Sequence, residues 1–147
     1  MKFRQKTNQM GFTLIEVMAV VVILGLLVTL VVPNVLGQQE KAQMQKAQVD
    51  IRNLSSALSM YKLENYHFPS TSQGLEALVN KPAGSPEAAN WTSSYVPRLP
   101  KDPWGNPYIY LQPGSKSKQS YDLWSYGADG KKGGQGADAD IGNWDLD

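Results

Sequence analysis

The sequence contains no cysteine and only one histidine, His67. Without cysteine the chain can form no disulfide, and thiol catalysis and cysteine-based metal sites are excluded. A single histidine excludes a zinc site built from several histidines and leaves little room for a catalytic triad. His67 stands between Tyr66 and Phe68 and is interpreted as a surface or packing residue. These absences argue against an enzyme.

The sequence also lacks a strong net charge. Its 147 residues carry 14 Lys and Arg against 13 Asp and Glu, which gives a formal net charge of +1. The basic residues are scattered and form no stripe interleaved with aromatic residues, so no nucleic-acid partner is indicated. There is no internal repeat. Beyond the apolar run described next, about 115 residues remain, which suits one small domain.

One long apolar run is present, over residues 12–32, and Glu16 is its only charged residue. As a helix rising about 1.5 Å per residue, the run would reach roughly 32 Å, enough to cross the hydrocarbon core of a bilayer. The run is too long for a secretory signal peptide, and no A-x-A-like cleavage site follows it. A plain membrane anchor is an alternative, but it would have no use for Glu16. A carboxylate in such a segment is costly and by default indicates a functional site.

The segment that joins the basic leader to this run, residues 10–16 (MGFTLIE), resembles the class III signal of type IV pilins and type II secretion pseudopilins. The resemblance implies that prepilin peptidase cuts between Gly11 and Phe12 and methylates the new N-terminus at Phe12. Residues 1–11 would then be a leader whose three basic residues favour the cytoplasmic side of the membrane. Their removal changes the formal net charge from +1 to −2.

Cleavage would expose an α-amine on Phe12, one helical turn from Glu16. A cation and a carboxylate in apolar surroundings each need a partner. Two pairings remain open: within one chain, or, as the resemblance implies, between the Glu16 carboxylate and the Phe12 amine of a neighbouring subunit. The second pairing would fix the axial register of helices that pack into a filament.

Pro33 directly follows the apolar run and is expected to kink the helix. Helical spacing then continues to about residue 66, with apolar residues on one face: Ala47, Ile51, Leu54, Leu58 and Tyr61. This pattern predicts one N-terminal helix of about 50 residues, apolar in its first half and amphipathic in its second. Three acids on the second half are interpreted as exposed or subunit-contact charges: Glu40, Asp50 and Glu64.

The rest of the chain has the pattern of a small α+β domain. A helix is expected over residues 72–79, with Thr71 or Ser72 as its N-cap, and a loop over 81–91. Residues 102–107 (DPWGNP) are dense in turn formers. Residues 108–111 and 121–125 read as strands that could pair as an antiparallel hairpin on the amphipathic helix.

Several segments along the whole chain resemble the major pseudopilins of bacterial type II secretion systems: 61–65 (YKLEN), 68–71 (FPST), 73–79 (QGLEALV), 102–108 (DPWGNPY) and 141–144 (IGNW). The resemblance implies an α+β, type IV pilin-like fold, in which one long helix packs on a small antiparallel sheet with a C-terminal metal-binding loop. Residues 12–33 would be the transmembrane and fibre-core helix, and residues 34–147 the periplasmic globular domain.

The same resemblance implies a structural protein of a Gram-negative bacterium. It would be inserted once in the inner membrane, with its N-terminus cytoplasmic, and would then polymerise into a periplasmic pseudopilus that exports folded proteins. Its partners would be copies of itself, minor pseudopilins, the inner-membrane secretion platform, prepilin peptidase and membrane lipid. The alternative is a type IV pilin of a surface pilus. Such pilins usually close their C-terminal region with a disulfide, which this chain cannot form.

The C-terminal region is rich in glycine and contains three aspartates, Asp129, Asp138 and Asp140. Calcium takes six to eight oxygen ligands in flexible geometry, but the spacing is not that of an EF-hand, and a solvated acidic tail remains an alternative. The resemblance implies one structural Ca²⁺ per subunit in place of the disulfide. Asp129 and one or both of Asp138 and Asp140 would supply carboxylates, and Tyr126 and Lys131 backbone carbonyls.

Overall fold

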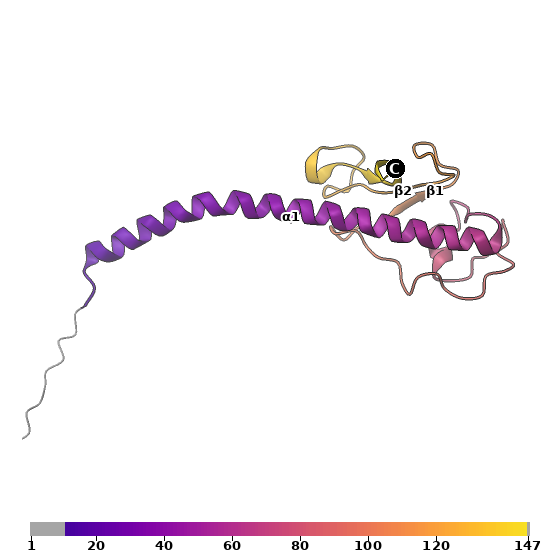
Figure 1. Ribbon diagram of the computed structural model, residues 1–147, viewed down its shortest axis with the longest axis horizontal. Coiled ribbons are helices and arrows are strands. Elements are labelled where there is room, and N and C mark those ends of the chain that lie inside the picture. The colour runs from indigo at the N-terminus through magenta and orange to yellow at the C-terminus, as the bar shows by residue number, and fades with distance from the viewer. Residues whose placement is uncertain (1–10, 147) are drawn as a thin grey trace, which may run out of the picture. The chain divides into compact units, whose positions relative to one another are not determined.

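The computed structural model describes residues 11–146, without the side chains of residues 30–36. Helix α1 spans Leu14–Asn65, 52 residues, so the predicted long helix is confirmed (Figure 1). Thr13 caps its start, because Thr13 Oγ1 accepts the N–H of Glu16 at 3.3 Å. The helix ends at Asn65, and the next residue, Tyr66, adopts a positive φ of 67° and donates its N–H to the Lys62 carbonyl at 2.7 Å.

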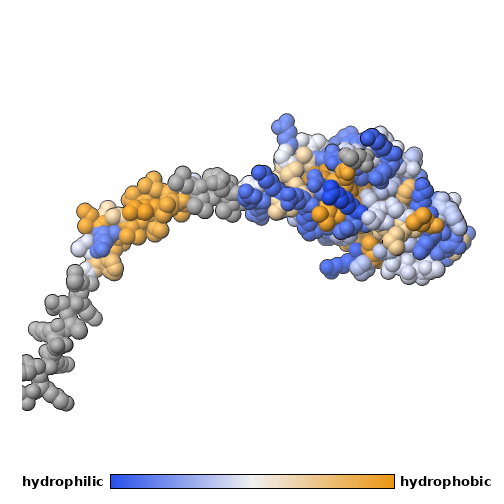
Figure 2. Space-filling view, viewed as in Figure 1, coloured by the Kyte–Doolittle hydropathy of each residue, from blue (hydrophilic) through white to orange (hydrophobic). Residues whose placement is uncertain are grey.

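The chain divides into two compact units at Gln38 and Gln39. In the first unit, the large apolar side chains from Phe12 to Val28 all point into solvent, with exposures from 49% at Val17 to 82% at Phe12. Figure 2 shows this part of the helix covered by hydrophobic side chains. Among the residues that the structure describes, no helix is long and apolar enough to cross a membrane. The predicted membrane span over residues 12–33 and the predicted kink at Pro33 both involve residues 30–36, whose side chains lie outside the described part of the chain.

In the second unit, the C-terminal half of α1 buries the predicted apolar face. Its residues are at most 1% exposed: Ala47, Ile51, Leu54, Leu58 and Tyr61. They form one core with Leu78, Tyr121, Leu123 and Ile141. The sheet lies along one side of this half of the helix (Figure 1). Helical spacing of the apolar positions explains why one face alone enters the core.

The second helical element is the 3₁₀ helix η1, Leu75–Leu78, which is shorter than the helix predicted over residues 72–79. Gly74 precedes it with a φ of 59°, and no side chain caps it, so the predicted cap was wrong. The Thr71 hydroxyl instead donates to the Gln112 carbonyl at 2.8 Å and accepts the Gln112 N–H at 2.9 Å. This contact with a distant segment takes the group that was expected to cap the helix.

The sheet contains three antiparallel strands in the order β1-β2-β3. Strand β1 is Ile109–Leu111, β2 is Asp122–Ser125 and β3 is Ile141–Gly142. The hairpin of β1 and β2 is confirmed, with Ile109 opposite Trp124. Strand β3 was not predicted, because two residues show no alternating pattern. Short 3₁₀ helices flank β3: η2, Gly136–Asp138, and η3, Asn143–Asp145.

The two polar residues of β2, Asp122 and Ser125, are both buried. The Asp122 carboxylate accepts the N–H groups of Ser115 at 2.7 Å, Lys116 at 2.9 Å and Ser117 at 2.8 Å. Burial alone would raise the pKa of Asp122, but these backbone donors outweigh it and lower the pKa to about 2. One ionised side chain therefore holds the loop between β1 and β2.

Acid should weaken the globular unit through Asp122. The pKa of this group is lower in the folded chain than its ordinary value of 3.8, so its stabilisation is present above about pH 4 and is lost as the pH falls towards 2. We expect the free energy of unfolding to fall by about 2 kcal/mol more in the parent chain than in Asp122→Asn over that range. Urea unfolding can be followed by tryptophan fluorescence, because all four tryptophans lie after residue 90. An equal decrease in the free energy of unfolding of the two proteins over this pH range would contradict this role of Asp122.

Candidate functional site

The residues around the predicted cleavage position make no contact that requires their identity. A Cβ placed on Gly11 would meet no atom within 4 Å. Gly11 is also not one of the described glycines with a positive φ. Phe12 is exposed. The fold of the described chain therefore gives no reason for glycine at position 11, and a requirement for it would have to come from processing.

Glu16 lies in the first turn of α1 and is exposed. A carboxylate is favoured there by the unpaired N–H groups of the helix N-terminus. The only ion pair among the described side chains joins Lys46 and Asp50, so the described part of the chain supplies no cation to Glu16. The structure leaves both predicted pairings of Glu16 with the Phe12 amine untested.

Between β2 and β3 the backbone folds back closely on itself. Gly127 has a φ of 73°, and a Cβ there would lie 2.7 Å from the Ala137 carbonyl oxygen. The Ala128 N–H donates to that same oxygen at 2.8 Å. A Cβ on Gly134 would overlap the Asp138 carbonyl oxygen. Glycine is therefore required at positions 127 and 134, where it lets the two ends of the loop meet.

This loop carries the three aspartates predicted as calcium ligands. Asp129 and Asp138 are exposed and Asp140 is half-buried. Asp129 accepts the Lys131 N–H, and Asp140 accepts the Gly133 N–H, each at 3.0 Å. Among the described residues, no three acidic or histidine side chains are close enough to hold a metal. The side chains of these three residues offer only oxygen donors, the kind that calcium prefers and that transition metals select less.

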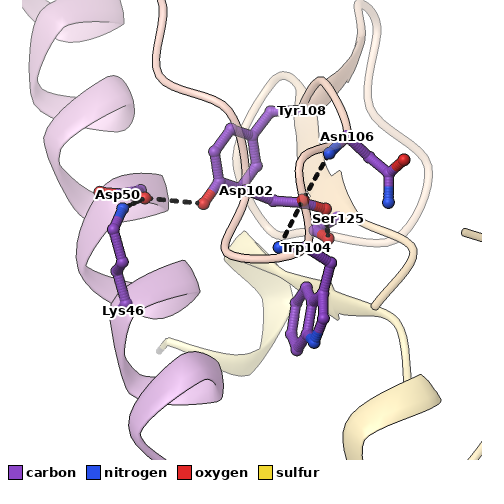
Figure 3. Close-up of polar contacts among 7 residues, drawn as sticks. All are labelled: Lys46, Asp50, Asp102, Trp104, Asn106, Tyr108 and Ser125. Carbon is purple, nitrogen blue, oxygen red and sulfur yellow. Dashed lines mark hydrogen bonds and ion pairs between the residues drawn. The ribbon is translucent and has the colours of Figure 1, made fainter. Parts of the chain in front are cut away.

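A tight turn lies against the start of this loop, and a buried carboxylate closes it (Figure 3). Asp102 is only 4% exposed. Its Oδ1 accepts the N–H groups of Trp104 at 3.1 Å and Asn106 at 2.7 Å. Its Oδ2 accepts the Ser125 hydroxyl at 2.6 Å. The Ser125 oxygen in turn accepts the N–H of Gly127 at 3.1 Å.

Tyr108 follows this turn and forms a hydrogen bond with α1 (Figure 3). The Tyr108 hydroxyl donates to Asp50 Oδ2 at 3.0 Å, and Lys46 forms an ion pair with the same carboxylate. Burial, followed by the Asp50 hydrogen bond, raises the pKa of Tyr108 well above its usual range. The side chain of Asp50 is 14% exposed. The interpretation of Asp50 as an exposed or subunit-contact charge was therefore wrong, because it bonds the helix to the turn.

His67 has a packing role, as expected. Its Nδ1 lies 3.1 Å from the Phe68 carbonyl oxygen, and its Nε2 lies 3.1 Å from that of Glu87. Its ring meets the edge of Tyr61 at a centroid distance of 6.0 Å. Both ring nitrogens face backbone oxygens, so the described contacts of His67 include no nucleophile.

Sequence reasoning missed Asp102 and Ser125. Both stand in segments correctly read as turn and strand, but a side chain that bonds backbone groups far along the chain leaves no periodic pattern. Thr13 was also missed. Here a pattern exists, because Thr13 and Glu16 have the S/T-x-x-E spacing of a capping box.

The match to known families first defines the class of protein to which the chain belongs. Residues 6–32 match the prokaryotic N-terminal methylation motif, so the chain is a pilin-like protein at its N-terminus. Residues 34–144 match the family described as type II secretion system (T2SS), protein G. The chain belongs to this family, the major pseudopilins, which are structural subunits of the pseudopilus used in protein secretion and are not enzymes.

Relatives from several bacteria match over nearly the whole chain. The type II secretion system core protein G of Pseudomonas aeruginosa is 57% identical and aligns over 96% of this chain and 99% of its own length. That of Vibrio cholerae is 56% identical, with 97% of each chain covered. A crystal structure of the major pseudopilin of the type 2 secretion system of enterohaemorrhagic Escherichia coli matches with a TM-score of 0.68 at 45% identity. It covers 79% of this chain and 98% of that one, which confirms the pilin-like α+β fold.

The close backbone contact at Gly127 can be separated from its positive φ by a matched pair of variants. Gly127 and Gly133 both have positive φ values, 73° and 94°, but a Cβ on Gly133 would meet nothing within 4 Å. We expect Gly133→Ala to lower the free energy of unfolding by about 1 kcal/mol and Gly127→Ala by about 1–3 kcal/mol more. Urea unfolding measures both. Equal losses would show that the Ala137 contact is unimportant.

Proposed function

We propose that this chain is made as a membrane-anchored precursor, which is cut between Gly11 and Phe12 and methylated at Phe12. Residues 12–33 cross the inner membrane once, with the N-terminus in the cytoplasm, and residues 34–147 lie in the periplasm. The methylation motif over residues 6–32 supports this processing. Gly11 supports it as well, because the described part of the fold gives no reason for glycine at that position. The basic leader favours this orientation.

After processing, the chain polymerises into the helical fibre of the pseudopilus. The observation that carries this proposal is the exposure of the apolar side chains from Phe12 to Val28, which no other described part of the chain covers. Such a surface needs lipid first and other copies of the same helix afterwards. In the fibre, the Glu16 carboxylate of one subunit pairs with the Phe12 amine of its neighbour, which sets the axial register.

Growth of this fibre pushes folded proteins through an outer-membrane channel. The specific partners are minor pseudopilins, the inner-membrane platform of the secretion system, prepilin peptidase and inner-membrane lipid. The family match favours secretion over the alternative, a surface pilus. Deletion of the gene should therefore stop the release of exported proteins. Loss of adhesion or motility with intact secretion would favour the surface pilus.

One structural Ca²⁺ binds the C-terminal loop of each subunit. Its ligands are the Asp129 carboxylate, the carboxylate of one or both of Asp138 and Asp140, and the main-chain carbonyls of Tyr126 and Lys131. The support is the all-oxygen donor set and the glycine contacts that bring the two ends of the loop together. When bound, calcium neutralises the loop carboxylates and holds the loop in one shape, the role that a disulfide has in pilins.

The experiment that tests the proposed processing is the intact mass of the membrane-extracted protein. The mass of residues 12–147 plus one methyl group supports the proposal. A full-length chain, or one cut elsewhere, would show that the class III signal is not used here.

Neutralising Glu16 should block assembly without blocking insertion or cleavage, because the Phe12 amine of the next subunit then lacks its carboxylate. We expect Glu16→Gln to leave mature monomer in the membrane and to reduce sedimentable fibre about tenfold or more, the effect of losing about 1.4 kcal/mol per contact. Glu87→Gln is the matched control, since Glu87 is an exposed acid of the globular unit and lies outside α1. Normal fibres from Glu16→Gln would refute the register role.

Removing calcium should lower the melting temperature of the globular unit by several degrees, because a ligand bound only to the folded state stabilises it. Asp129→Asn should abolish most of the difference between calcium and chelator. Glu87→Gln, a change at an acid outside the loop, should keep that difference. Differential scanning calorimetry measures it, and identical melting curves for the parent chain with calcium and with chelator would exclude a structural metal.

A further inference from the structure

We propose that Asp102 is a positioning residue for the C-terminal loop. Through Ser125 it fixes the backbone at Gly127, and it thereby sets the affinity of the loop for a divalent cation. The effect on cation affinity rests on the calcium site proposed above. The effect on the backbone at Gly127 does not depend on that site.

The first observation is the unusual setting of the Asp102 charge. The carboxylate is almost fully buried, and the only ion pair among the described side chains lies elsewhere, between Lys46 and Asp50. A buried carboxylate without a cation is costly unless donors satisfy it. Two of its three described donors, the N–H groups of Trp104 and Asn106, belong to its own turn. The third is Ser125, from strand β2, and its 2.6 Å bond is the shortest of the three.

The second observation is the direction of the hydrogen bonds through Ser125. An ionised Asp102 can only accept, so the single hydroxyl proton of Ser125 points to Asp102 Oδ2. The lone pairs of the same oxygen are then free to accept the Gly127 N–H at 3.1 Å. The charge on Asp102 therefore fixes the orientation in which Ser125 can hold Gly127.

The third observation is that Gly127 begins the part of the loop that carries most of the proposed ligands. A small shift of Gly127 would break its close contact with Ala137 and the bond from Ala128 to the Ala137 carbonyl. The turn also lies close to the loop further along, since a Cβ placed on Gly130 would be 3.6 Å from the side-chain Nδ2 of Asn106. The backbone N–H of the same Asn106 donates to Asp102. The turn closed by Asp102 thus lies beside the loop on both sides of Asp129.

Asp122 supplies a control within the same molecule. It too is a buried aspartate that accepts backbone N–H groups, but those groups belong to Ser115, Lys116 and Ser117 in the other loop. Loss of either carboxylate should lower stability. Only loss of Asp102 should release the backbone at Gly127, because Ser125 bonds Asp102 and not Asp122.

The test compares the full-length chain in detergent with Asp102→Asn, Ser125→Ala and Asp122→Asn. Calcium affinity is measured by isothermal titration with CaCl₂, and backbone opening by amide hydrogen exchange in chelator. We expect Asp102→Asn and Ser125→Ala to raise the Kd for calcium about tenfold or more and to speed exchange over residues 127–131. Asp122→Asn should speed exchange over residues 115–117 and leave exchange over residues 127–131 as slow as in the parent chain, because the bonds from Asp102 through Ser125 to Gly127 stay in place.

An unchanged Kd in Asp102→Asn and Ser125→Ala would overturn the proposed effect on affinity. Exchange over residues 127–131 that is as fast in Asp122→Asn as in Asp102→Asn would show that the effect is not specific to Asp102. If the parent chain binds no calcium, the calcium site is wrong, and hydrogen exchange alone decides the role of Asp102. Exchange over residues 127–131 that is as slow in Asp102→Asn as in the parent chain would then overturn the positioning role.

Discussion

The exposed apolar surface of α1 between Phe12 and Val28 is the constraint on which the rest of the molecule depends. Its burial contributes about 25 cal/mol per Å², but the hydrophobic effect is non-directional and sets no register. A single acid in that surface, Glu16, supplies a directional contact if its partner belongs to another copy. The chain belongs to the type II secretion pseudopilin family, whose members build a pseudopilus from many copies of one helix. In such an assembly the apolar surface and the Glu16 carboxylate would both serve helix packing.

In the second unit the loops must be held in place without disulfides, because the chain contains no cysteine. Two buried carboxylates do this by accepting backbone N–H groups: Asp122 for the loop between β1 and β2, and Asp102 for the turn beside the C-terminal loop. Glycine at position 127 allows the backbone to meet itself. A Tyr108–Asp50 hydrogen bond joins the residue that follows this turn to α1. The proposed calcium would add a further restraint in the exposed part of the C-terminal loop.

Periodicity predicted the parts of the fold that repeat. The apolar face of α1 and the β1–β2 hairpin follow from spacings of three to four and of two residues, and both are confirmed. Strand β3 has two residues, too few for a pattern. Asp50 was misread because helical spacing alone does not show that the Tyr108 hydroxyl forms a hydrogen bond with it. The roles proposed for Gly11, Phe12 and Glu16 come from a short motif, since processing and assembly leave little trace in the fold of one chain.

The most direct test of the central claim asks which chain supplies the partner of Glu16. Fibres are assembled from equal amounts of ¹⁴N- and ¹⁵N-labelled subunits and treated with a carbodiimide, which joins a carboxylate to an amine in contact with it. A crosslinked peptide between Glu16 and the Phe12 amine that carries one label on each half is predicted, because the two groups belong to neighbouring subunits. Crosslinked peptides that carry only matching labels would place both groups in one chain and contradict the claim.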